Sequence, residues 1–197
     1  MKRRSFALLL LFALLCGGCD SVRLDRQAMV LCLALDEQEG KLLLSARFPK
    51  LSQGGGEYTT LAVTGDSLPD ALEKLRAATP FTLNYTNVRL IALSEGLVRQ
   101  NDLLSLLRPL LALRGMDGGA GVLVARGSAG DFIDALKPDF GNRLSKHIEL
   151  GIATQVAQGF IPHAALAQTV RLLLGGRQDP LLLLGAVNPK NQPSESS

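Results

Sequence analysis

The sequence of 197 residues contains no tryptophan, two histidines and three cysteines. Aromatic residues make up 5% of the chain, whereas hydrophobic residues as a group make up 47%, so we expect a core built from aliphatic side chains. Neither His147 nor His163 has a partner at metal-ligand spacing, and the G-x-S-x-G and H-E-x-x-H motifs are missing. These absences favour a protein that is not an enzyme and that needs no cofactor or metal.

The chain also lacks an excess of charge once its first residues are set aside. Its 21 basic and 18 acidic residues give a formal net charge of +3. Residues 1–18 hold three of the basic residues and none of the acidic ones, so 18 of each remain and the net charge becomes zero. No electrostatic case for nucleic-acid binding is left.

The first eighteen residues have the pattern of an export signal. Lys2, Arg3 and Arg4 precede an apolar run from Phe6 to Leu15, and small residues follow. A ten-residue helix covers ~15 Å, about half of the ~30 Å hydrocarbon core of a bilayer. We therefore predict that residues 1–18 are a signal peptide rather than a membrane-spanning helix.

Two cysteines close this segment in the order Cys16-Gly17-Gly18-Cys19. The C-x-x-C spacing also occurs in redox pairs and zinc sites, but no strand precedes it and no second ligand pair follows. The stretch Gly17-Gly18-Cys19 resembles the lipobox of bacterial lipoproteins, with Cys16 where leucine is usual. That resemblance implies that Cys19 becomes the first mature residue and carries the lipid, with an uncleaved or ordinarily cleaved signal as the alternative.

Hydrophobic periodicity and turn residues predict one mixed α/β domain over residues 19–187, with helices packed on a mixed sheet of about five strands. The segment 28–35 predicts a buried strand, "DEQEG" a turn, and 41–48 a second strand that completes a hairpin. Cys32, within the first strand, is expected to be a small core residue. Further strands are predicted at 58–65, 81–86, 88–94, 121–127 and 181–187.

Helices are predicted at 67–79, 101–113, 129–138, 142–158 and 162–176. Ser67 is the expected cap of the first, whose buried stripe is Leu68, Ala71, Leu72, Leu75 and Ala78. Asn101 is the expected cap of the second, and Pro162 is expected at the start of the last. Residues 188–197 read as a polar, disordered tail.

Several motifs admit a functional reading, but a structural one is favoured for each. Gly54–Gly56 lacks the Gly-Lys-Ser/Thr ending of a phosphate loop, and Gly118–Gly121 leads into a strand rather than a helix. Both are expected to be turns. Asp131 and Asp134 stand in a predicted helix, where an acid near the N-terminus is favourable without any catalytic role.

The order of segments from Cys19 onward resembles the Ger(x)C spore-germination lipoproteins, the C subunits of nutrient-germinant receptors. Cys19 is followed by a polar stretch with Arg23 and Asp25, and then by "QAMVLCLALDE", an apolar strand ending in Asp36. The segments "TGDSLPDALEKL", "LNYTNVRLIALSEGL", "GVLVARGSAGDFIDALKP" and "GRQDPLLLL" follow in family-like order. Asp20 replaces the tryptophan that usually follows the lipidated cysteine.

This resemblance implies a lipoprotein on the outer face of the spore inner membrane, anchored through Cys19. It would act without catalysis, relaying germinant binding together with an A subunit and a permease-like B subunit. An exported solute-binding or hydrolytic lipoprotein is the alternative, and a deep polar pocket with convergent groups would favour it.

Overall fold

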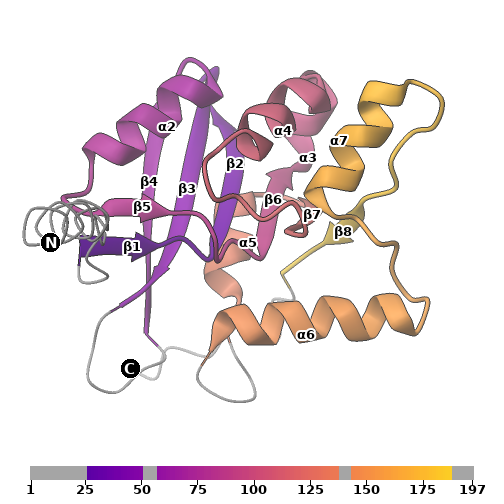
Figure 1. The fold of residues 1–197 in the computed structure, drawn as a ribbon. Coiled ribbons are helices and arrows are strands. Elements are labelled where there is room, and N and C mark those ends of the chain that lie inside the picture. Colours follow the sequence, from indigo (N-terminus) through magenta and orange to yellow (C-terminus); the bar gives the residue numbers. More distant parts are fainter. Residues whose placement is uncertain (1–25, 51–56, 138–142, 188–197) are drawn as a thin grey trace, which may run out of the picture.

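A computed structural model describes residues 26–50, 57–137 and 143–187 and shows a mixed α+β fold, as predicted (Figure 1). The strands are β1 (Gln27–Met29), β2 (Cys32–Gln38), β3 (Lys41–Pro49), β4 (Tyr58–Gly65), β5 (Thr82–Asn84), β6 (Leu90–Ser94), β7 (Gly121–Ala125) and β8 (Leu183–Gly185). The helices are α2 (Leu68–Ala77), α3 (Glu95–Gln100), α4 (Leu103–Leu111), α5 (Ala129–Ala135), α6 (Leu144–Ala157) and α7 (Leu166–Gly175).

Six strands form the main sheet, in the order β4-β3-β2-β6-β7-β8, where about five were expected. Strands β2, β6, β7 and β8 are mutually parallel, whereas β3 and β4 are antiparallel to their neighbours. The short strands β1 and β5 form a separate parallel pair. The long connections that parallel pairing requires are supplied by the helices.

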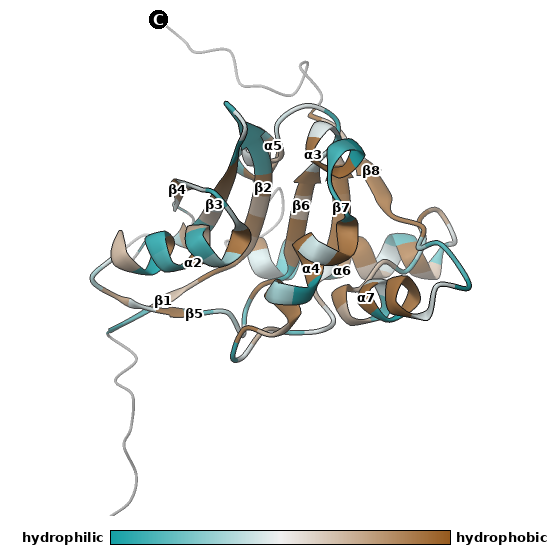
Figure 2. Ribbon diagram, turned by 90° about the horizontal axis from the view of Figure 1, so that it is seen from above, coloured by the Kyte–Doolittle hydropathy of each residue, from teal (hydrophilic) through white to brown (hydrophobic). Residues whose placement is uncertain are grey.

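Helices cover both faces of this sheet, which is apolar through its centre (Figures 1 and 2). Leu33 and Leu35 of β2 join a core with α2, α4 and α7, and Cys32 and Ala34 join a second core with α5 and α6. Successive side chains of a strand point to opposite faces, so one apolar run serves both layers. The sheet therefore has no solvated face at its centre.

The β2–β3 hairpin is confirmed, with Cys32 opposite Arg47 and Gln38 opposite Lys41. Its turn is tighter than predicted, because β2 continues through Asp36 to Gln38. Glu39 and Gly40 alone make the turn, with φ angles of 52° and 75°. Two successive positive φ values suit the right-handed twist of the flanking strands.

The prediction of one continuous strand at 28–35 is wrong, because the segment forms two strands that pair with different neighbours. Its first part, β1, pairs with β5, and its last part belongs to β2. At the change, the Val30 amide donates to the Asn84 carbonyl at 2.9 Å, and the Leu31 amide donates to the Arg47 carbonyl at 2.9 Å. A continuous apolar run indicates burial but does not indicate which strand is the partner.

The first predicted helix is confirmed as α2. The Ser67 hydroxyl accepts a hydrogen bond from the Asp70 amide at 3.4 Å, and proline occupies the first turn. Leu68, Ala71, Leu72 and Leu75 are buried, but Ala78 is exposed at the C-cap, one residue beyond the helix. The stripe is therefore one position shorter than predicted.

The helix predicted at 101–113 corresponds to α4, but it begins two residues later than predicted because a further helix, α3, ends at Gln100. Helix α3 was missed, and Asn101 is its C-cap rather than the N-cap of the next helix. Asp102 caps α4 instead, accepting from the Leu104 and Ser105 amides at 3.3 and 3.1 Å. Pro109 lies inside α4, which continues past it to Leu111.

The last helix starts later than Pro162. Residues before it run alongside the sheet, where the Val122 amide donates to the Ala164 carbonyl at 2.7 Å and the Leu166 amide donates to the Ala120 carbonyl at 2.8 Å. This bridge keeps the chain extended until Leu166 begins α7. Gly176, with φ of 59°, ends the helix in the left-handed conformation that glycine favours.

Candidate functional site

An open groove of about 750 Å³ lies at the edge of the sheet where the parallel strands β2, β6 and β7 end. Asp36, Glu37 and Glu39 line it from the β2–β3 hairpin, and Glu95 and Arg99 line it from α3. The hairpin tip and α3 carry the hydrophilic colouring at this end of the sheet (Figure 2). In open α/β sheets, ligands bind outside the carboxyl ends of the strands, so this groove is the candidate binding site.

The most buried acid of the groove, Asp36, is already engaged with the protein. Its side chain is 6% exposed, and its two oxygens accept hydrogen bonds from the Ala129 and Gly130 amides at 2.7 and 2.8 Å. These amides belong to the first turn of α5, where a carboxylate is favourable. Asp36 therefore fixes the start of α5 to β2, and no ligand is needed to satisfy it.

Arg47 of β3 holds the other end of the same helix. Its guanidinium donates to the Ile133 carbonyl, lies 3.6 Å from the Asp134 carboxylate and stacks over the Tyr58 ring at 5.3 Å from its centroid. A cation is favourable at a helix C-terminus. We call Asp36 and Arg47 the α5 clamp, because two buried charges from neighbouring strands grip the two ends of one short helix.

Of the two acids in α5, Asp134 contacts Arg47 of the α5 clamp, whereas Asp131 is exposed to solvent. Asp134 accepts a hydrogen bond from the Thr60 hydroxyl in addition to its pairing with Arg47. Asp131 is exposed in the first turn of α5, and its amide is bonded to the Ser128 hydroxyl at 3.1 Å. The Asp134 carboxylate thus has structural partners, whereas the Asp131 carboxylate lies at the surface in the first turn of α5.

The groove also contains an ion pair that lies at the protein surface. Glu95 and Arg99, one turn apart on α3, approach to 2.6 Å. The hydrogen bond from the Arg99 guanidinium holds the pKa of the Glu95 carboxyl below its ordinary value. A carboxylate kept ionised by its neighbour is not suited to act as a general acid.

Cys32 is buried in the core, as predicted. Its side chain is fully shielded on the α5 side of the sheet, and burial raises the pKa of the thiol to about 12. The thiol is therefore protonated at neutral pH and is a poor nucleophile. It is the one free cysteine in the part of the chain that the structure describes.

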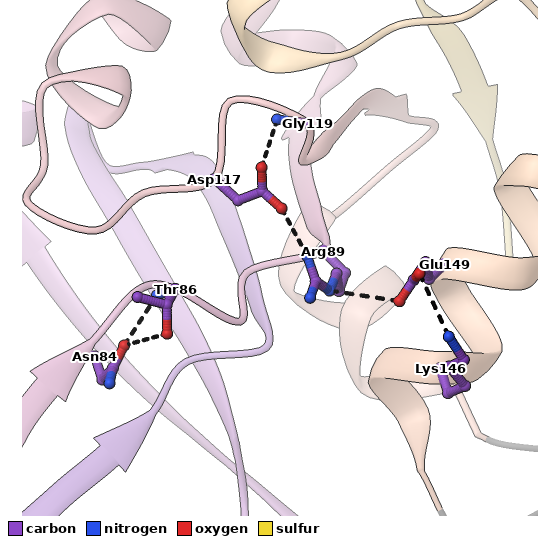
Figure 3. Close-up of polar contacts among 7 residues, drawn as sticks. All are labelled: Asn84, Thr86, Arg89, Asp117, Gly119, Lys146 and Glu149. Carbon is purple, nitrogen blue, oxygen red and sulfur yellow. Dashed lines mark hydrogen bonds and ion pairs between the residues drawn. The ribbon is translucent and has the colours of Figure 1, made fainter.

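The opposite edge of the sheet carries a network of charges around Arg89, just before β6 (Figure 3). Arg89 lies 2.6 Å from Asp117 and 3.8 Å from Glu149 of α6, and Glu149 lies 3.5 Å from Lys146. The other Asp117 oxygen accepts from the Gly119 amide at 2.8 Å. The network joins the loop before β7 to α6, and each of its charges has a partner of opposite sign.

The two histidines lie on different elements. His147 is half-buried on α6, and His163 is exposed before α7, with its Nδ1 atom 2.7 Å from the Gln168 side-chain oxygen. Over residues 26–50, 57–137 and 143–187, no group of three or more His, Cys, Asp or Glu side chains could hold a metal ion. In the same ranges, no helix has the length and apolarity to cross a membrane.

Exposed apolar side chains gather in the last third of the chain. Among the described residues, five of the six large hydrophobic side chains that are exposed come from α6, α7, β8 and their connections. We use the name β8 surface for these five residues, which come from helices on both faces of the sheet as well as from its β8 edge: Leu150, Phe160, Leu174, Leu181 and Leu184. Strand β8 is also an edge of the sheet, with β7 as its one neighbour. Apolar surface beside an open sheet edge is typical of protein–protein contacts.

Sequence reasoning missed the α5 clamp and the β8 surface. Asp36 was assigned to a turn, although an acid continuing the inward face of an apolar strand is a detectable signal of a buried partner. Cys16, Cys19 and Gly54–Gly56 lie outside the described residues, so the predictions for them stay predictions.

In a comparison with protein families, residues 20–185 match the model described as the spore germination protein N-terminal domain. The match covers most of the chain and nearly all of the domain predicted from the sequence. No curated protein and no solved structure matches the chain.

Proposed function

The chain belongs to the family of the spore germination protein N-terminal domain, and from this premise we propose that it is a membrane-anchored lipoprotein subunit of a spore nutrient-germinant receptor. It works as a non-catalytic interaction and signal-relay component, together with an A subunit and a permease-like B subunit. The observation that carries the proposal is the family match over residues 20–185, which supports a role in spore germination.

The anchor in this proposal is a lipid on Cys19, which holds the domain at the outer face of the spore inner membrane. The support comes from the sequence: a basic start, a ten-residue apolar run and the Gly17-Gly18-Cys19 ending. The family match begins at residue 20, directly after this cysteine. The matched region thus starts directly after the proposed point of attachment.

The contact with the partner subunits in this proposal is made by the β8 surface. Phe160 and Leu181 are 77% and 75% exposed, and Leu184 of the edge strand is 60% exposed. Burying an apolar side chain of this size against a partner contributes about 1.5–3 kcal/mol. The alternative, a solute-binding or hydrolytic lipoprotein, would depend on the groove beside α3, whose most buried acid is held by α5.

The function is tested by deleting the gene in spores that lack redundant paralogues. We expect the response to nutrients to be lost, while germination triggered by dipicolinate, which bypasses nutrient receptors, persists. An unchanged nutrient response would reject the receptor assignment. Flanking genes for A and B subunits would support it independently.

The partner contact is tested by the double substitution Leu181→Asp and Leu184→Asp. The substitutions replace two apolar side chains of the contact by charges that binding would have to desolvate. We therefore expect both copurification with the B subunit and the rate of nutrient germination to fall about tenfold or more. Phe81→Asp is the matched control, because Phe81 is the one exposed large hydrophobic residue that lies outside the β8 surface in the described chain. Equal effects of the two variants would argue against a contact at β8.

A further inference from the structure

Helix α6 buries far less of itself than its length allows. Of its 14 residues, Leu144 and Ile148 are buried, whereas the ten-residue α2 buries four. Both buried residues of α6 lie in its first half, and Leu150 on its outer side is 54% exposed. In Figure 1 the helix extends along the lower side of the molecule, beneath the sheet. A helix in a protein owes most of its stability to the packing of an apolar face, so α6 is weakly supported.

A hollow of about 270 Å³ lies beneath this helix. Ile148, Gly151 and Ile152 line it from α6, and Leu90, Leu123 and Leu183 form its floor on the sheet. A Cβ atom added at Gly151 would meet no atom within 4 Å. The hollow is open to the surface rather than enclosed, so α6 covers this part of the sheet incompletely. The helix therefore rests on the sheet through a loose contact.

Two polar contacts tie α6 to the rest of the fold, and Leu144, Ile148 and Ile152 pack against the second core. The Leu144 amide donates to the Tyr58 hydroxyl at 2.8 Å, and Glu149 pairs with Arg89 at 3.8 Å (Figure 3). Ile152 reaches the start of β7, where a Cβ added at Gly121 would lie 2.9 Å from its terminal methyl group.

The partner of Glu149 belongs to the rigid part of the molecule. The Arg89 amide donates to the Leu31 carbonyl at 2.9 Å, and its carbonyl accepts from the Gly121 amide at 3.0 Å. The backbone of Arg89 is thus fixed in the sheet, and its side chain alone reaches out to α6.

We infer that α6 is a strap that opens as one unit while the sheet stays folded, with the Arg89–Glu149 pair as its latch. Opening uncovers the apolar floor formed by Leu90, Leu123 and Leu183. A detached helix of 14 residues is marginal in water, so its amides lose protection whenever it opens. The strap is a conformational device of this domain and does not depend on the proposed receptor role.

Native-state hydrogen exchange of the full chain in mild detergent, measured at a series of urea concentrations, tests the strap. The amides from His147 to Ala157 should share one opening, about tenfold or more faster than the slowest amides of β2 and with a shallower dependence on urea. Glu149→Gln removes the latch, and all of these amides should exchange about two- to fivefold faster together. Gly151→Ala should slow them together about fourfold, because alanine favours the helix and fits the empty space.

Glu95→Gln is the matched control, because it breaks a surface ion pair on α3 and leaves α6 untouched. It should not change the difference in protection between α6 and β2. The inference is overturned if α6 shares the protection and the urea dependence of the sheet strands. It is also overturned if Glu149→Gln speeds exchange only at the residues next to position 149, since that result would mean local fraying rather than the opening of a unit.

Discussion

We expect replacement of Cys19 by alanine to abolish lipid labelling of the chain and to remove its stable attachment to the membrane. Two acyl chains anchor a protein where a single chain binds marginally, since each buried CH₂ contributes ~0.8 kcal/mol. The residues that follow the leader carry no net charge with which to replace the lipid. The variant should therefore appear either as released domain or as unprocessed precursor held by its leader.

The measurement is labelling of spore-forming cells with a palmitate analogue, followed by membrane fractionation. Cys16→Ala and Cys32→Ala are the controls. The first changes a residue that the proposed cleavage would discard with the leader, and the second changes a buried core thiol. Both should keep the label. Label retained in Cys19→Ala, or lost in Cys16→Ala alone, would show that another cysteine is the acceptor.

We expect replacement of Asp36 by alanine to lower the free energy of unfolding by about 3 kcal/mol. The substitution leaves two amide donors of α5 without their acceptor, the buried one of Ala129 and the partly buried one of Gly130. Hydrogen bonds to a charged group contribute about 1.5–3 kcal/mol, and a buried donor left unpaired costs about 1–3 kcal/mol. Because the lost contact joins β2 to α5, the effect falls on the tertiary structure rather than on one helix.

Urea unfolding followed by circular dichroism measures the effect. Asp131→Ala is the matched control, because Asp131 is an exposed acid in the first turn of the same helix and contributes about 0.3–1 kcal/mol through the helix dipole. Asp36→Asn tests the charge, since the amide keeps one acceptor but turns a donor toward a second donor. Losses equal to that of Asp131→Ala would mean that the α5 clamp does not stabilise the fold.

The proposed partner contact at the β8 surface and the proposed opening of α6 share one residue. Leu184 belongs to both, because it is exposed on the edge strand and also lines the hollow under α6. The two proposals can still be separated. The double substitution at Leu181 and Leu184 tests a contact with a partner, whereas Glu149→Gln changes the opening of α6 and leaves both leucines in place.

Local sequence patterns determined much of this fold. The hairpin of β2 and β3 follows from two apolar runs around a short polar turn, and the start of α2 follows from Ser67 with proline in the first turn. Burial of Cys32 follows from its place in an apolar run. Each of these features depends on residues a few positions apart, so each can be read from the chain directly.

The tertiary structure alone decided the features that join distant segments. Asp36 accepts from an amide 93 residues away, and the Arg47 guanidinium donates to a carbonyl 86 residues away. The break between β1 and β2 and the late start of α7 likewise come from pairing with other strands, at Asn84 and at Ala120. Periodicity and turn residues indicate which residues are buried and where the chain reverses. They do not indicate which distant group forms the hydrogen bond to a buried charge or to a backbone amide.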